Sequence, residues 1–300
     1  MTVGIVGLGL IGGSMAKSIK ARTAHTVFGC DLDQETMMMA RMCGAIDAPL
    51  TAKNLKECDL VLVAIRPAAA VKWVKEHAEG IRRDAILVDL CGVKRAVVRE
   101  LAPVAEQYGF AYIGGHPMAG SEKTGIENAK ALLLENAYYV LTPAAKVTGE
   151  MVERYRDLVA SLKAIPLILT YEKHDYVTAA ISHLPHIIAS SLVNLVKDCD
   201  YEDGTMKKVA AGGFKDITRI ASSSPEMWEQ ICSANSENIL SVLDEYINSL
   251  IEIKFSLAEH NTNCIHDLFE TSRDYRNSIS DSGSGPIPKA YSIYCDMVDE

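Results

Sequence analysis

The chain has 300 residues, of which 48% are hydrophobic and 23% are charged, and its formal net charge is −9 at pH 7. This length suits two domains or one large domain, and the composition is that of an ordinary globular protein. The negative charge, which no cluster of Lys and Arg interrupts, excludes a broad nucleic-acid-binding surface.

The cysteines and the apolar segments indicate a soluble, cytoplasmic protein. None of the 8 cysteines forms a CxxC pair, so zinc-ribbon spacing is absent, and their scatter fits a reducing compartment. The apolar N-terminus lacks the basic region of a signal peptide. Other apolar runs, such as residues 60–65, are too short to span a bilayer. We therefore expect no membrane partner.

Short apolar runs alternate with helical patterns over residues 1–171. Seven of them are strand candidates: 2–7, 26–31, 60–65, 85–90, 111–115, 137–142 and 165–170. Continuous apolar strands that alternate with helices predict a parallel sheet covered on both faces. The fold class is therefore α/β, with a Rossmann-like doubly wound domain over residues 1–171.

The first strand runs directly into a glycine loop, "GLGLIG", that opens a helix. Its residues are Gly7, Gly9, Leu10, Ile11 and Gly12. The glycines allow a tight turn, close approach of a pyrophosphate and close helix packing, and the helix N-terminus faces the phosphates. Asp31, at the end of the second strand, suits the adenosine ribose hydroxyls and would repel a 2′-phosphate. The loop predicts NAD; the alternative is a nucleotide-free turn with a surface aspartate.

Residues 112–125, "YIGGHPMAGSEKTG", place His116 between two glycines and a proline. We expect Gly114, Gly115 and Pro117 to form a turn that fixes the histidine at the carboxyl end of a strand, where ligands bind in such sheets. A neutral histidine there can take a proton from a hydroxyl during hydride transfer. A purely structural histidine is the alternative.

After Tyr171 the strand pattern stops, and residues 174–197 and 225–259 are predicted to be long helices. Residues 172–275 would form a helical substrate and dimerisation domain, because long amphipathic helices suit a homodimer interface. Residues 276–300 would form a polar linker and a terminal strand, which must pair with this chain or another.

Four separated blocks resemble, in order, the prephenate/arogenate dehydrogenase family of tyrosine biosynthesis. They are the glycine loop, "GGHPMAGSEKTG", "HDYVTAAISHLPH" (174–186) and "GGFKDITRIA" (212–221), which Trp228 in "SPEMW" follows. The resemblance implies NAD-dependent oxidation of the ring C4 hydroxyl of prephenate. Loss of the ring carboxylate as CO₂ then gives an aromatic product.

The resemblance also implies roles for individual residues. His116 would accept the hydroxyl proton, and Arg219 would bind a substrate carboxylate, for which a planar guanidinium is suited. Asp216, three residues earlier on the same helical face, could orient Arg219, whereas Lys215 is interpreted as a solvated charge. Glu122 matches a position near the pocket, with a helix-start glutamate as the alternative.

The histidines of the second block have several possible roles. By resemblance, His186 lines the substrate pocket, while His183 is a candidate contact or a packed, hydrogen-bonded histidine. Their spacing could hold a metal, but no third ligand accompanies them, so none is predicted. The pair His174–Asp175 resembles a family pair near the site mouth, and a helix N-terminal cap is an equal contender.

Two features depart from the family pattern. In "DLCGVK", Gly92 stands where the family often has a serine that bonds the substrate hydroxyl, and Cys91 before it is interpreted as a small buried thiol. The tail "IPKAYSIYCDMVDE" resembles the first strand of an ACT-type regulatory domain. Whether it belongs to a shortened domain or pairs across a dimer stays open. Feedback by tyrosine through a complete ACT domain is not expected.

Other functions remain as alternatives. Arogenate dehydrogenase, which forms tyrosine, is the nearest, because one local charge near the side chain could decide between the two substrates. A β-hydroxyacid dehydrogenase or imine reductase shares the architecture but lacks the "GGHPMAG" block. A regulator that senses NAD would bind the cofactor without turnover.

Overall fold

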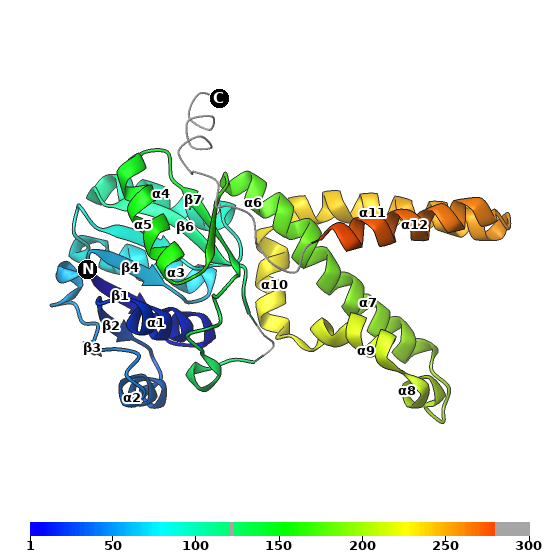
Figure 1. Cartoon of the computed structure of the whole chain (residues 1–300), viewed down its shortest axis with the longest axis horizontal. Coiled ribbons are helices and arrows are strands. Elements are labelled where there is room, and N and C mark those ends of the chain that lie inside the picture. The colour runs from blue at the N-terminus through cyan, green and yellow to red at the C-terminus, as the bar shows by residue number, and fades with distance from the viewer. Residues whose placement is uncertain (121–122, 280–300) are drawn as a thin grey trace. The chain divides into compact units, whose positions relative to one another are not determined.

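The computed structural model describes residues 1–120 and 123–279. They form two compact units, the first spanning Met1–Asp175 and the second beginning at Tyr176. The first unit contains a sheet covered by helices, and the second is helical (Figure 1).

The first unit is built on an eight-stranded sheet with the order β3-β2-β1-β4-β5-β6-β7-β8. Its strands are β1 (Thr2–Val6), β2 (Thr26–Cys30), β3 (Ala48–Pro49), β4 (Leu60–Val63), β5 (Ile86–Asp89), β6 (Ala111–Pro117), β7 (Tyr138–Pro143) and β8 (Ile165–Ile168). All seven predicted strands are confirmed. The additional strand, β3, is two residues long and pairs with β2.

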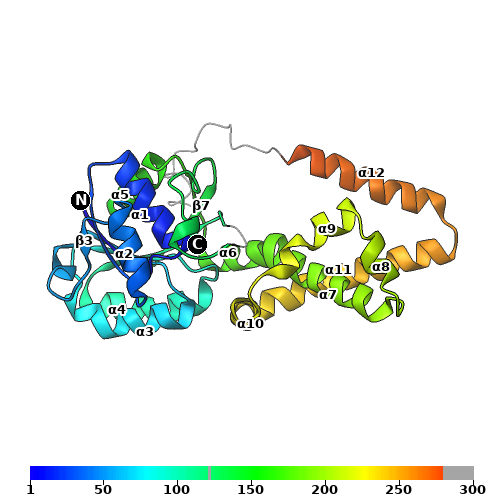
Figure 2. The ribbon, with the colours of Figure 1, turned by 90° about the horizontal axis from the view of Figure 1, so that it is seen from below.

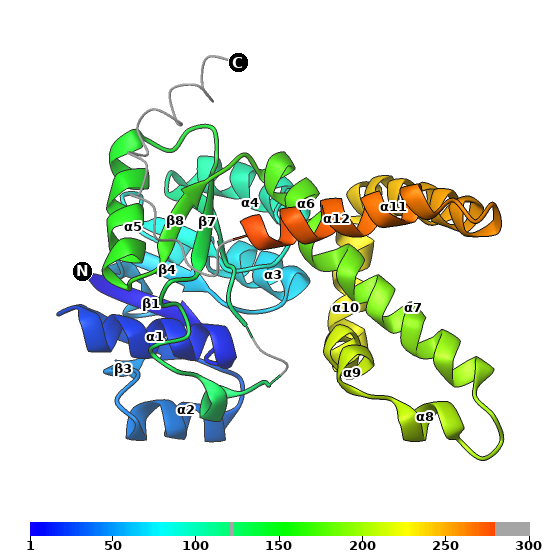
Figure 3. The same cartoon turned by 45° about the vertical axis from the view of Figure 1, so that its right-hand side comes forward.

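One pair of neighbouring strands departs from the predicted parallel sheet. β6 and β7 are antiparallel, whereas the other neighbouring pairs are parallel. β7 and β8, one of the parallel pairs, lie side by side (Figure 3). Among its described residues, the connection 118–137 contains a 3-10 turn, η3 (Ile126–Asn128), and no α-helix. Parallel neighbours usually need a crossover helix, and here the chain returns without one and enters β7 in the opposite direction.

Helices cover both faces of the sheet, as a doubly wound fold requires. They are α1 (Leu10–Arg22), α2 (Gln34–Met42), α3 (Pro67–His77), α4 (Arg95–Tyr108) and α5 (Gly149–Ser161), with 3-10 turns η1 (Leu55–Glu57) and η2 (Ala78–Gly80). Residues of α1 and α5 line one apolar core, and residues of α3 and α4 line the other (Figure 2).

Strand β4 shows why its sequence is continuously apolar. Leu60 and Leu62 belong to the core beneath α1 and α5, while Val61 and Val63 belong to the core beneath α3 and α4. Successive side chains of a strand point to opposite faces, so a strand buried on both sides needs an apolar residue at every position.

The second unit contains the long helices that the sequence predicts. Its elements are α7 (Leu184–Cys199), α8 (Thr205–Val209), α9 (Gly212–Thr218), the 3-10 turn η5 (Arg219–Ser222), α10 (Pro225–Ala234), α11 (Ser236–Ala258) and α12 (Thr262–Ser278). The chain reverses between α11 and α12 (Figure 2). α12 includes the first three residues of the predicted linker, 276–278. The predicted terminal strand lies outside the described residues.

One continuous helical segment, Tyr171–Cys199, connects α6 (Tyr171–Thr178) to α7 through a π-helical turn, η4 (Ala179–His183). The backbone N–H of Leu184 donates to the carbonyl of Ala179, five residues earlier. Pro185 follows at once and has no N–H to offer Ile181, so the regular α-helical bonding is interrupted here. This segment replaces the single uninterrupted helix that the sequence predicts over 174–197.

By length and composition alone the same segment could cross a membrane, because it contains an 18-residue window with a mean hydropathy of 1.4. This differs from the expectation that the apolar runs are too short. However, Asp175 lies in this segment and accepts hydrogen bonds from the backbone at the start of α4. An ionised group bonded to a neighbouring element fits a helix packed within a protein better than one surrounded by lipid.

Candidate active site

The glycine loop is shaped for a dinucleotide. Gly7 has a φ of +85°, and a Cβ on Gly12 would lie 1.9 Å from the carbonyl oxygen of Gly7. Gly9, the N-cap of α1, has open space where its Cβ would stand and provides no side-chain cap. The first N–H groups of α1, beginning at Leu10 and Ile11, are therefore available to a phosphate. This cradle fits the pyrophosphate of NAD.

Asp31 lies beside this cradle. Its Oδ2 accepts a hydrogen bond from the backbone N–H of Leu8 at 2.7 Å, and its Oδ1 accepts one from Asp33 at 3.0 Å. The carboxylate at the end of β2 is thus fixed against the loop, where the sequence predicts contact with a ribose.

The predicted turn around His116 is wrong. Gly114, Gly115, His116 and Pro117 are all strand residues of β6, and His116 pairs with Val140 of the antiparallel neighbour β7. β5 pairs with β6 only as far as Gly114, so β7 alone extends the strand through the histidine. His116 is therefore held by a β-ladder at the end of the sheet and not by a turn.

The two glycines before His116 are explained by close packing. A Cβ on Gly114 would lie 2.2 Å from Thr142 Oγ1 and 2.9 Å from Lys94 Cδ. On Gly115 it would lie 2.7 Å from Val88 Cγ1. Side chains from neighbouring elements therefore occupy the space that any larger residue would need, and the backbone below His116 is tightly enclosed.

His116 is connected to a buried carboxylate through a second histidine. Its Nδ1 lies 2.8 Å from His174 Nε2, and His174 Nδ1 lies 2.8 Å from Asp175 Oδ1. Both His174 and Asp175 are buried. Since α6 begins at Tyr171, the pair does not cap its own helix; Asp175 instead accepts from Lys94 N and Arg95 N at the start of α4.

A second buried charge pair lies beneath the same strand. Lys94 Nζ donates to Asp89 Oδ1 at 2.5 Å and to the Gly115 carbonyl at 2.7 Å, and neither charged side chain is exposed. Tyr112 donates its hydroxyl to Asp89 Oδ2 at 2.7 Å. Burial and the nearby carboxylate raise the pKa of Tyr112, so it remains a donor. These bonds fix the backbone directly before His116.

Gly92 lies next to the imidazole. A Cβ built there would stand 3.7 Å from His116 Nε2 and 3.9 Å from Cε1, at ordinary van der Waals distance. Cys91 is buried, and burial raises the pKa of its thiol well above the usual value, which agrees with an inert thiol. Gly92, the position at which the resemblance implies a serine, therefore faces the candidate base.

In the second unit, His183 and His186 both contact Trp228. His186 stacks on the indole with ring centroids 3.8 Å apart, and His183 meets it edge to face at 5.9 Å. His183 is buried, and its Nδ1 lies 3.2 Å from Asn235 Nδ2, while Asn235 Oδ1 accepts from Asn238. The two histidines are thus part of one aromatic cluster.

His186 also lies near a cation. Its Nδ1 lies 2.9 Å from the Ser182 carbonyl, so Nδ1 carries the hydrogen. The pKa of His186 is lowered by burial and by the charge of Arg219, which overcome the opposing effect of that carbonyl. The imidazole of His186 is therefore neutral, and it lies against Trp228 and near the charge of Arg219.

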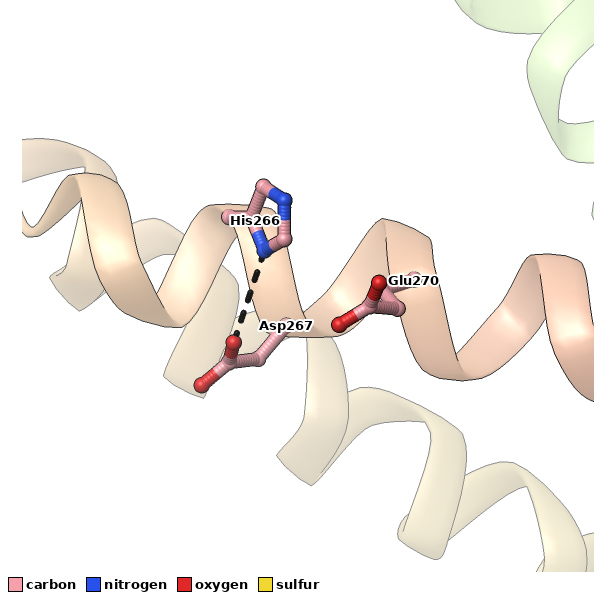
Figure 4. Close-up of side chains that lie close together, drawn as sticks. All are labelled: His266, Asp267 and Glu270. Carbon is pink, nitrogen blue, oxygen red and sulfur yellow. Dashed lines mark ion pairs between the residues drawn. The ribbon is translucent and has the colours of Figure 1, made fainter.

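Other predicted site residues are not joined to this cluster. In the part of the chain that the structure describes, Asp216 makes no ion pair with Arg219; it is exposed on α9, as is Lys215. Glu122 lies outside the described residues. A further trio, His266, Asp267 and Glu270, lies on α12 with its ligand atoms within 4.8 Å of one another (Figure 4). All three residues are exposed, and no role is assigned to them.

The sequence did not predict the direct contact of His174 with His116. It also did not predict that Lys94 and Asp89 form a buried pair below His116, or that Asn235 contacts His183. The one available signal was His174–Asp175 within a family block. Lysine is rarely fully buried without a partner, so nothing in "GVKR" distinguished Lys94 from a surface cation.

A Rossmann-like sheet with a phosphate cradle and a histidine at the end of one of its central strands defines a nicotinamide-dependent oxidoreductase. Two family models match the chain: "Prephenate dehydrogenase, nucleotide-binding domain" over residues 15–167 and "Prephenate dehydrogenase, dimerization domain" over 170–271. The chain belongs to the prephenate dehydrogenase family.

Individual relatives agree with this assignment. The chain is 37% identical to a prephenate dehydrogenase of Bacillus subtilis, over 99% of its own length and 81% of the relative's. It resembles the crystal structure of prephenate dehydrogenase from A. aeolicus with hydroxyphenyl propionate and NAD+ (28% identity, TM-score 0.86, 93% and 98% of the two chains). It also resembles Synechocystis arogenate dehydrogenase (27%, TM-score 0.81, 93% and 100%). The predictions of the family, the fold and an NAD-dependent enzyme are confirmed.

Proposed function

We propose that the protein oxidises prephenate to 4-hydroxyphenylpyruvate and CO₂, with His116 as the base. The observation that carries this proposal is the placement of His116 at the end of β6, in the unit with the phosphate cradle, held through Nδ1 by a buried pair. A rigidly positioned imidazole is what proton abstraction from a hydroxyl requires.

The reaction can be written with its atoms balanced. His116 takes the proton of the C4 hydroxyl while the C4–H bond breaks, and bound NAD accepts that hydride. The bond to the ring carboxylate then breaks, CO₂ leaves, and its electron pair completes the aromatic ring. His116 returns the proton to the phenolic oxygen. Aromatisation of the ring makes the overall reaction effectively irreversible.

The second unit supplies groups suited to an anionic, ring-shaped substrate. Arg219 would bind a carboxylate through its guanidinium. Neutral His186 and the indole of Trp228 offer a polar edge and an apolar surface. Glu122 and Asp216 are retained as proposed substrate contacts. Asp31 favours NAD over NADP because its charge would repel a 2′-phosphate.

The decisive experiment measures NADH or NADPH formation with prephenate and with arogenate, using NAD and then NADP. Turnover of prephenate with NAD is expected. Absence of turnover with either substrate would contradict the proposal. Faster turnover of arogenate would favour the second candidate, arogenate dehydrogenase, which the likeness to the Synechocystis enzyme supports.

Gly92→Ser is expected to raise kcat/KM about 2–10-fold, the effect of one added hydrogen bond of roughly 0.5–1.5 kcal/mol. A Cβ at this position would stand 3.7 Å from His116 Nε2, which leaves room for the side chain. The serine hydroxyl would then lie near the nitrogen that is proposed to accept the substrate proton. Gly92→Ala is the matched control, because it adds the Cβ without the hydroxyl. A serine variant no faster than the alanine variant would contradict this role.

Residues 172–275 are proposed to form the substrate and dimerisation domain. Through this domain, two copies of the chain are proposed to form a homodimer. The matching family model is a dimerization domain, and large apolar side chains are exposed along α11 and α12. They include Leu240, Ile247, Leu250, Ile251, Phe255, Leu257, Phe269 and Tyr275. Such a surface on a water-exposed chain indicates a partner. Sedimentation should give twice the 32.7 kDa mass of one chain; a monomer at micromolar concentration would contradict it.

We also propose a cytoplasmic location.

A further inference from the structure

Two buried side chains in the first unit form a directed hydrogen-bonded series that ends at the candidate base. Asp175 uses Oδ1 for Lys94 N and Oδ2 for Arg95 N, each at 2.8 Å, and its Oδ1 also faces His174 Nδ1. His174 Nε2 then faces His116 Nδ1. Because the start of α4 holds the carboxylate by two backbone bonds, Asp175 cannot turn away from His174.

The protonation of the series follows from Asp175. Burial would raise the pKa of Asp175, but the hydrogen bonds from His174 and from the backbone of Arg95 and Lys94 outweigh it, so the pKa is lowered and the group is ionised. An ionised carboxylate only accepts, so His174 carries a hydrogen on Nδ1. Burial lowers the pKa of His174 in spite of the opposing bond to Asp175, so the ring is neutral and its lone pair lies on Nε2.

This arrangement leaves one choice for His116. A lone pair on His174 Nε2 requires a hydrogen on His116 Nδ1, and a neutral His116 then has its lone pair on Nε2. That nitrogen is the one that faces Gly92. Lys94, which lowers the pKa of His174, and Asp89, which raises it, also act on this ring and are paired with each other.

We propose that His174 and Asp175 are positioning residues that select Nε2 of His116 as the atom that accepts the substrate proton. The inference rests on the proposed function of His116 as the base. As the substrate O–H bond breaks and the Nε2–H bond forms, His116 becomes positively charged. It keeps its Nδ1 hydrogen on His174, and the charge of Asp175, two hydrogen bonds away along the series, stabilises it. No proton needs to pass along the series.

The first test compares two substitutions of His174, one that keeps a hydrogen-bond acceptor and one that keeps only the packing. His174→Gln keeps an oxygen acceptor near the position of Nε2, whereas His174→Leu fills the buried space without any acceptor. We expect kcat to fall about 10–10²-fold for His174→Leu and only a few-fold for His174→Gln, with little change in KM. A merely packing role would favour leucine over a buried amide. Equal activities, or a faster leucine variant, would overturn the proposal.

The second test does not depend on turnover. The ¹⁵N chemical shifts of the histidine side chains should show the Nδ1–H form for both His116 and His174 in the wild-type protein. In Asp175→Asn the amide can turn either its oxygen or its NH₂ group to His174, so the shifts should move towards a mixture of forms. An Nε2–H form of His116 in the wild-type protein would overturn the proposal even if the enzyme is active. Failure to oxidise prephenate or arogenate would instead overturn the proposed function and leave this result standing.

Discussion

Replacing His116 by asparagine is expected to lower kcat about 10²–10⁴-fold, the usual contribution of a positioned general base. Asparagine can keep a hydrogen bond towards His174 but cannot accept the substrate proton. The strand position is paired through its backbone with Val140, so the fold should tolerate the change. Steady-state rates with saturating substrate and NAD measure the effect.

His77→Asn is a suitable control for this experiment. His77 belongs to the same unit but stacks on Trp73 at the end of α3, with ring centroids 4.4 Å apart. It should leave kcat unchanged, and both variants should bind NADH as the wild type does. If the His116 variant keeps the kcat of the wild type, His116 is not the base and its role is structural.

Arg219→Ala is expected to raise KM for the substrate about 10–10²-fold, which corresponds to hydrogen bonds to a charged group worth about 1.5–3 kcal/mol. The guanidinium is exposed at the start of η5 and acts on the pKa of His186. It is therefore accessible to a ligand that also meets that ring. kcat should change less than KM, because carboxylate binding is made in the ground state as well.

Lys215→Ala provides the matched control, since it removes the same charge from a neighbouring, exposed position on α9. A general attraction of the anionic substrate would give similar increases in KM for both variants and would weaken equally with added salt. A large effect confined to the Arg219 variant indicates direct binding. Similar effects would contradict the assigned role.

Much of the first unit could be predicted because its strands are buried on both faces and therefore continuously apolar. β3, with two residues, is too short to produce such a run. The reversal at β7 could not be predicted, because an apolar run carries no information about strand direction. Glycine permits turns, which is why the sequence predicts one at Gly114 and Gly115, whereas here it permits close packing under a strand.

The site was predictable where a residue acts through its own chemistry and its position at the end of a strand, as His116 does. It was not predictable where a residue acts through a partner distant in sequence. His174 and Asp175 approach residues 58 and 80 positions away, respectively. Asn235 bonds His183 at a separation of 52. Such contacts depend on the packing of elements, which local patterns do not contain.

The π-helical turn at Ala179–His183 has a consequence for the histidines on either side of it. A π-turn holds one residue more than an α-turn, so every side chain after it is rotated by about 100° from a regular helix. A helical wheel drawn through 171–199 would misplace either His174 and Asp175 or His183 and His186. The extra residue therefore changes which face of the helix carries His183 and His186, compared with the face that a regular helix would give them.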